Sequence, residues 1–155
     1  MLTGVFQVSR VVSNLERSLA FYRDLLGMTV ASDAMAPPGP AQTSPYLDKF
    51  FNKDGVRMKY LSLRSGALYA PSCLELTCWE EPASAPMPKF GPWDVGFHWL
   101  QLRVDSVEAM HKKLSAAGVR FLGPPVVADR WKAVMCFDPD GYGIELLQSP
   151  LEPSA

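Results

Sequence analysis

The chain has 155 residues, the size of one ordinary domain or of two small modules. Apolar residues make up 48% and charged residues 20%, so a packed core is expected and a disordered chain is excluded. The formal net charge of −1 carries no basic footprint for nucleic acid, and no apolar run is long enough to span a bilayer. Because the start lacks the basic and apolar regions of a secretory signal, we predict a cytoplasmic protein that binds neither nucleic acid nor membrane.

The first half of the chain predicts one strand, one helix and three further strands. Residues 5–12 are rich in valine and predict the first strand. Residues 13–27 begin with a Ser13-x-x-Glu16 capping box, continue with apolar residues at helical spacing and end at a glycine. Strands follow at 28–32, 56–63 and 73–79. A Pro-rich insertion at about 33–53 is expected to contain a lid loop or a disordered segment at 33–45 and one amphipathic turn at 46–51.

The second half repeats this order. Residues 95–104 predict a strand, and Asp105 with Glu108 predicts a capped helix that ends at Gly118. Strands are expected at 119–122, 126–137 and 143–148, where the last two flank an Asp-Pro-Asp-Gly turn. We therefore predict an α+β fold with a first βαβββ module at 1–80, a linker at 81–93, a second βαβββ module at 94–150 and a tail at 151–155.

Matching positions in the two halves indicate an internal duplication. His98 follows Gln7 at the same offset as Gly118 follows Gly27 (98 − 7 = 91). The segment centred on Glu145 answers the one centred on Glu75 at a smaller offset (145 − 75 = 70). The difference of about 21 residues has the size of the Pro-rich insertion, which is how an insertion in one copy of a repeat shifts its register.

Four polar residues lie in these apolar strands or at their starts: Gln7, Glu75, His98 and Glu145. Taken one at a time, a strand Glu more often faces solvent, and a strand His more often has a hydrogen-bonded place in the core. A buried Glu, however, is costly unless it is paired or bound to a metal. Their matching places in a duplicated pattern favour a joint site. One imidazole, one amide oxygen and two carboxylates suit one divalent ion such as Zn, Ni, Co, Mn or Fe.

Three segments resemble the vicinal oxygen chelate superfamily, which includes glyoxalase I, bleomycin resistance proteins and extradiol dioxygenases. They are 13–28 (Ser13-Asn14-Leu15-Glu16 to Gly27-Met28), Leu74-Glu75-Leu76-Thr77, and 137–146 (Phe137-Asp138-Pro139-Asp140-Gly141 to Leu146). The resemblance covers nearly the whole chain. It implies two tandem βαβββ modules that form a cup-shaped mixed β-sheet around one metal ion, held by Gln7, Glu75, His98 and Glu145.

The resemblance implies proton-transfer chemistry at that metal. A divalent ion that chelates a hydroxy-carbonyl compound would stabilise an enediolate, with Glu145 or Glu75 as the base. We therefore expect a metal-dependent isomerase or epimerase of a small hydroxy-carbonyl compound, such as a sugar-like or cyclitol ketone. A glyoxalase I-type lyase, a metal-dependent dioxygenase and a non-catalytic small-molecule binding or resistance protein are the alternatives. Val11, Trp79 and Asp94 replace the residues that hold glutathione in glyoxalase I.

Strand alternation predicts which neighbours line the substrate pocket and which edges pair. Because two modules of this size expose sheet edges, we also expect a homodimer, with the site formed within one chain or across two. The predicted pocket residues are Ser9, Val11, Met58, Tyr60, Thr77, Trp79, Leu100 and Trp131.

Overall fold

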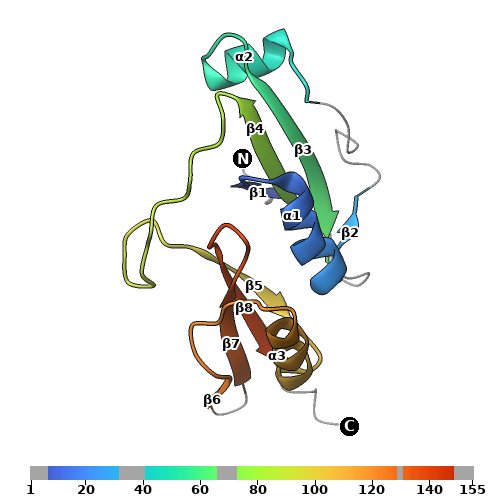
Figure 1. The fold of residues 1–155 in the computed structure, drawn as a ribbon, viewed down its shortest axis with the longest axis vertical. Helices are drawn as coiled ribbons and strands as arrows, with labels where there is room; N and C mark the ends of the chain where they lie inside the picture. Colours follow the sequence, from blue (N-terminus) through green and yellow to red (C-terminus); the bar gives the residue numbers. More distant parts are fainter. Residues whose placement is uncertain (1–6, 32–40, 66–72, 129–130, 149–155) are drawn as a thin grey trace, which may run out of the picture. The chain divides into compact units, whose positions relative to one another are not determined.

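The protein is described here by a computed structural model covering residues 7–31, 41–65, 73–128 and 131–148. The chain folds into two compact units, Met1–Pro86 and Met87–Ala155. Each unit contains one four-stranded sheet with parallel and antiparallel pairs, and helices are few (Figure 1). The α+β prediction with two tandem modules is confirmed. Within the described residues, no helix is both long and apolar enough to cross a membrane.

Unit 1 has strand order β1-β4-β3-β2, with β1 parallel to β4 and the other pairs antiparallel. The four predicted strands are present, although residues 5–6 and 32 lie outside the described residues. The predicted lid loop at 33–45 lies largely outside them as well. The elements are β1 (Gln7–Val11), α1 (Leu15–Leu19), η1 (Ala20–Leu25), β2 (Thr29–Val30), α2 (Pro45–Phe51), β3 (Arg57–Arg64) and β4 (Cys73–Glu81).

One face of the unit 1 sheet is covered by the helix that α1 and η1 form together. The Asn14 side chain caps it by accepting a hydrogen bond from the Arg17 amide at 2.9 Å. Its second half, η1, is π-helical, which adds a residue to the turn. The helix ends at Gly27, whose φ of +81° is the left-handed conformation that glycine adopts without strain. The helix buries Leu15, Leu19 and Tyr22 against this face of the sheet. The buried residues of the strands are Leu61 and Leu63 in β3 and Leu74 and Leu76 in β4.

The opposite face of this sheet is partly covered by α2, which is the amphipathic turn expected at 46–51. The Ser44 hydroxyl caps α2 by accepting from the Leu47 amide, and Asn52 ends it at φ +51°. Leu47 is buried in a small cluster with Val56 and Met58. Figure 1 shows α2 at the end of β3 and β4 that is distant from β2. The Pro-rich insertion therefore contains a packed helix.

Unit 2 has strand order β5-β8-β7-β6, with β5 parallel to β8. Its helix α3 buries Val107 and Leu114, and the Ile144 and Leu146 side chains are fully buried in the sheet beside it. The elements are β5 (Trp99–Arg103), α3 (Val107–Ala116), β6 (Val126–Ala128), β7 (Trp131–Phe137) and β8 (Gly143–Gln148).

Four predictions about unit 2 need correction. The single strand expected at 126–137 is two antiparallel strands, β6 and β7, because Val126 pairs with Ala133. The strand expected at 119–122 is reduced to one bridge between Phe121 and Cys136. The first strand begins at Trp99 and not at 95. The helix is capped by Ser106, whose hydroxyl accepts from the Ala109 amide at 3.1 Å, and not by Asp105.

Candidate functional site

Eight of the predicted site residues share one face of the unit 1 sheet, the face away from α1. The registers pair Ser9 with Glu75, Tyr60 with Thr77, and Met58 with Trp79, and side chains of registered residues point to the same side. The alternation used in the sequence therefore holds in this unit, and Val11 also lies on this face. The full set is Gln7, Ser9, Val11, Met58, Tyr60, Glu75, Thr77 and Trp79.

The Glu75 carboxylate is the polar centre of that face. The Gln7 Nε2 group donates to its Oε2 atom at 3.0 Å, and the Ser9 hydroxyl donates to its Oε1 atom at 2.9 Å. The Thr77 hydroxyl donates to the same Oε1 atom at 3.5 Å, the longest of the three contacts. Hydrogen bonds to neutral donors offset the loss of water around a half-buried carboxylate. Gln7 and Glu75, two of the four expected metal ligands, thus lie in contact.

The charge of this carboxylate affects the pKa of Tyr60. Burial raises the pKa of the Tyr60 phenol above its ordinary value of 10.0, and the negative charge of Glu75 raises it further. Both causes oppose the phenolate, so Tyr60 stays a neutral hydrogen-bond donor on the face that carries Glu75. This face therefore offers a ligand one carboxylate and one phenol from adjacent strands.

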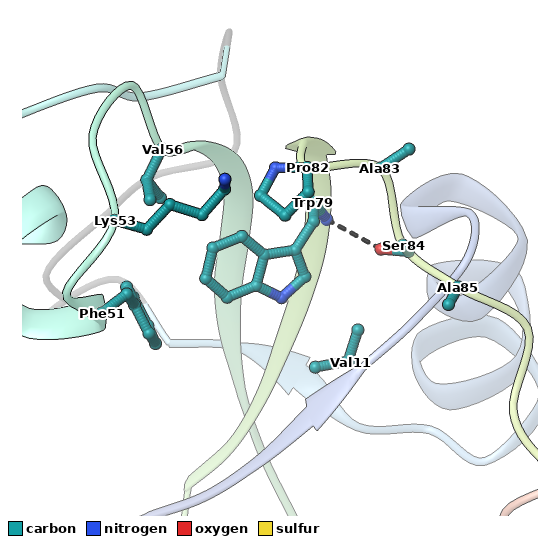
Figure 2. Close-up of a pocket in the computed structure, with 9 residues that line it drawn as sticks. All are labelled: Val11, Phe51, Lys53, Val56, Trp79, Pro82, Ala83, Ser84 and Ala85. Carbon is teal, nitrogen blue, oxygen red and sulfur yellow. Dashed lines mark hydrogen bonds between the residues drawn. The ribbon is translucent and has the colours of Figure 1, made fainter.

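A pocket of about 230 Å³ lies farther along the same face, at the end of β4. Residues 82–85 close one side of it, because the Trp79 amide donates to the Ser84 hydroxyl at 3.0 Å and Glu80 bridges to Ala83. Figure 2 shows the Trp79 indole in the middle of this pocket. Two predicted pocket residues, Val11 and Trp79, thus contribute walls. The lining residues are Val11, Phe51, Lys53, Val56, Trp79, Pro82, Ala83, Ser84 and Ala85.

In unit 2 the neighbour of Glu145 is a tryptophan. The Trp99 Nε1 group donates to the Glu145 Oε2 atom at 2.8 Å. The register pairs Gln101 with Glu145 and Trp99 with Gly143, which places Trp99 two residues before the partner of Glu145. Gln7 has the same relation to Glu75, because Ser9 is the partner of Glu75. Trp99 is therefore the structural counterpart of Gln7.

His98 lies on the other side of the unit 2 sheet. Its ring is 5.1 Å from the ring of Tyr142, and its Nδ1 atom is 3.3 Å from the Gly96 carbonyl oxygen. A side chain added to Gly143 would meet the Trp99 and Phe97 side chains, which confirms that odd-numbered residues occupy the Glu145 face. The structure thus does not bring His98 and Glu145 together.

The remaining two predicted pocket residues are also separated by the sheet. Leu100 pairs with Ile144, whose side chain is fully buried on the α3 face, so Leu100 lies on the covered side and not in an open pocket. Trp131 lies on the same side as Met135, the registered partner of Glu145, and is 46% exposed. Glu145 therefore shares its face with two tryptophans, Trp99 and Trp131.

A single extra residue explains why the repeat offset of 91 misplaces His98. The strands correspond at an offset of 92, since Trp99 matches Gln7 (99 − 7 = 92), and the capping residues Asn14 and Ser106 match at the same offset. The π-helical turn η1 then adds one residue in unit 1, so the closing glycines differ by 91. Aligning Asn14 with Ser106, instead of with Asp105, would have matched Gln7 with Trp99.

The imidazole ligand that was expected beside Glu145 is not on the face of the sheet that carries Glu145. The indole of Trp99 is a hydrogen-bond donor with no lone pair to offer a metal, and it stands where an imidazole was expected. Gln7, Glu75 and Glu145 remain on the open faces, which is an oxygen set without a nitrogen ligand. No group of three His, Cys, Asp or Glu side chains placed to hold an ion occurs within the described parts of the chain.

Comparison with known proteins identifies the family. The sequence profile of the glyoxalase/bleomycin resistance protein/dioxygenase superfamily matches residues 4–146. The chain belongs to this superfamily. The resemblance stated from the sequence is thereby confirmed at the level of the superfamily, whose members include glyoxalase I, dioxygenases and antibiotic-binding proteins and commonly bind a divalent metal. A search of curated proteins gives no match.

Solved structures of superfamily members share the fold at low identity. A glyoxalase family protein from Bacillus cereus has 16% identity and a TM-score of 0.83 over 97% of both chains. The trypanothione-dependent glyoxalase I of Leishmania major has 23% identity and a TM-score of 0.63, over 92% of this chain and 84% of its own. TnmS3, an antibiotic-binding protein from Streptomyces sp. CB03234, has 23% identity and a TM-score of 0.61, over 96% and 97%.

Proposed function

We propose that this protein binds a small organic molecule on the open face of its unit 1 sheet, and that binding does not depend on a metal ion. The observation that carries the proposal is the hydrogen bond from Trp99 to Glu145, which puts an indole at the place of an expected ligand. The polar centre at Glu75 and the pocket beside Trp79 supply the binding surface. A binding or resistance protein is a known kind of member of the superfamily.

The arrangement of unit 1 suits recognition by hydrogen bonding. One carboxylate with fixed neutral donors, a neutral phenol and an aromatic pocket lie along one sheet face. Such a mixture of a few oriented polar groups with apolar walls is typical of small-molecule sites. A ligand with a hydroxyl or ammonium group would replace the Ser9 or Thr77 contact at Glu75.

A metal-dependent isomerase or epimerase is the competing proposal. The contact between Gln7 and Glu75 favours it, because these two oxygen-bearing side chains already converge. The nitrogen ligand that was expected beside Glu145 is supplied by neither Trp99 nor His98. The metal-dependent lyase and dioxygenase alternatives share the requirement for that ion.

Metal titration of the purified chain separates the two proposals. Calorimetry with Ni²⁺, Zn²⁺, Co²⁺ and Mn²⁺ should give no stoichiometric binding tighter than about 100 μM, a free energy of about −5.5 kcal/mol. Glu75→Gln and Glu145→Gln should leave the titrations unchanged. Stoichiometric binding that either variant abolishes, together with metal-dependent deuterium uptake into a hydroxy-ketone, would establish the isomerase and overturn the proposal.

A homodimer belongs to the same proposal. The edge strands β1 and β5 each have one unpaired side in the described structure, and unpaired edges favour pairing with another chain. Light scattering behind a sizing column should give twice the chain mass of 17.1 kDa. A mass equal to one chain at micromolar concentration would contradict it.

A further inference from the structure

The Trp79 pocket has a rigid aromatic floor. The ring centroids of Phe51 and Trp79 are 4.7 Å apart with an angle of 78° between the planes, so the two rings meet edge to face. The Trp79 backbone is fixed at Ser84. Tyr60 and Trp79 also pack on the buried cluster of Leu47, Val56 and Met58. The indole is therefore held in place while its side chain remains partly exposed to the pocket.

The volume of the pocket is suited to a single planar ring system and not to a whole drug-sized ligand. Its volume of about 230 Å³ lies below the roughly 300–1,000 Å³ of sites that enclose a whole drug-sized ligand. Apart from Lys53 and Ser84, the side chains that line it are apolar. A planar ring stacked on the indole would fill this space, with the rest of a larger ligand directed along the sheet.

One positive charge marks the rim. Lys53 is the charged member of the nine lining residues, and within the described residues its ammonium group has no ion pair. Figure 2 shows its side chain among the residues that line the pocket. An anionic substituent on a stacked ring would meet this ammonium group. Charge complementarity thus favours a ligand that carries an anionic group in addition to an aromatic ring.

We infer that this pocket binds a planar aromatic anion, with its ring on the Trp79 indole and its acid group at Lys53. The inference rests on the proposed small-molecule binding function and names the ligand class. Glu75 lies four residues before Trp79 on β4, about 13 Å away at the rise of a strand. A ligand that reached both places would carry its anionic ring at one end and a hydrogen-bond donor at the other.

The test uses 2-naphthoate and its neutral analogue 2-naphthalenemethanol as probes of the full chain. Binding is followed by calorimetry and by the indole N–H signals in a ¹H–¹⁵N spectrum, with the Trp79 signal assigned from Trp79→Phe. Both probes should shift that signal, and 2-naphthoate should bind more tightly. Lys53→Gln should weaken 2-naphthoate about fivefold and leave the alcohol unchanged, as expected for one exposed charge pair.

Matched controls separate the pocket from general effects. Lys49→Gln removes an exposed lysine of α2 that does not line the pocket, and Trp93→Leu removes a tryptophan that is 85% exposed. Both should leave binding unchanged, whereas Trp79→Leu should abolish it for both probes. If Trp79→Leu unfolds, the comparison of Lys53→Gln with Lys49→Gln still shows whether Lys53 binds the acid group of 2-naphthoate.

Three outcomes overturn the inference: no shift of the Trp79 signal, equal binding of acid and alcohol, or equal effects of the two lysine variants. Its failure is distinguishable from failure of the proposed function. If the chain bound Ni²⁺ at Glu75 and Glu145 and also bound 2-naphthoate through Lys53, the proposed function would be wrong only in its claim of metal independence, and the ligand class would stand. If the chain bound neither metal nor 2-naphthoate, the inference of a planar aromatic anion would be wrong, whereas the proposal of metal-independent binding would not be contradicted.

Discussion

The Trp99 indole donates a hydrogen bond to the Glu145 carboxylate at 2.8 Å, and His98 next to it points to the opposite side of the sheet. Successive side chains of a strand alternate between faces, so only one of these two neighbours can reach Glu145. The register of β5 and β8 selects Trp99. This position therefore supplies a hydrogen-bond donor, in a superfamily whose members commonly bind a divalent metal ion.

Trp99→His is expected to increase the affinity of the chain for a divalent metal ion. The new imidazole would share a face with the Glu145 carboxylate, and the two could hold one Ni²⁺ or Zn²⁺ ion. We expect affinity to rise at least about tenfold, or about 1.4 kcal/mol, in calorimetric titrations. Trp99→Phe, which supplies no ligand, is the control and should not show the gain.

His98→Ala provides the opposite comparison. Because the His98 ring packs near Tyr142 and away from Glu145, its removal should leave metal titrations of the natural chain unchanged. If His98→Ala abolished stoichiometric metal binding, His98 would be a metal ligand in solution, and the register of β5 and β8 would be wrong.

Glu75→Gln should lower the pKa of Tyr60 without returning it to 10.0. Burial is the larger cause of the raised pKa, and the Glu75 charge is the smaller one, so removing the charge removes a part of the shift. The ¹³Cζ signal of Tyr60, assigned from Tyr60→Phe, reports this titration. An unchanged Tyr60 pKa in Glu75→Gln would mean that the two groups are not neighbours.

The raised pKa of Tyr60 also fixes the sign of a pH effect on stability. Above pH 10.0 the folded chain keeps the phenolic proton that the unfolded chain loses, so the unfolded state binds fewer protons. The contribution of Tyr60 is complete below that pH and decreases as the pH rises through the folded value. Urea unfolding from about pH 9 to pH 11 should show a shallower loss of stability in Tyr60→Phe than in the natural chain.

The sequence predicted the class of fold, and it predicted that Gln7, Ser9 and Glu75 share one face, because local signals there are strong. The capped helix before Gly27 and the alternation around Glu75 lead directly to α1, β4 and the open face. His98 was expected beside Glu145 because the closing glycines Gly27 and Gly118 were aligned, and the extra residue of η1 shifts that alignment by one. Phe51 and Lys53 could not be assigned to a pocket, because that depends on how α2 and residues 82–85 fold back onto the sheet.

Tyr22→Phe should destabilise unit 1 although it adds no volume and removes one oxygen atom. Arg10 is 2% exposed, and its Nη1 group donates to the hydroxyl of Tyr22, a residue of η1, at 2.8 Å. Removing the acceptor leaves a buried charged donor less well satisfied, which costs about 1–3 kcal/mol. Urea unfolding measures the difference, and Tyr46→Phe, at a position 64% exposed, should change stability by less than about 0.5 kcal/mol. Equal effects of the two substitutions would mean that the hydrogen bond from Arg10 contributes nothing to the folded state, and that the aromatic ring of Tyr22 alone stabilises the helix against the sheet.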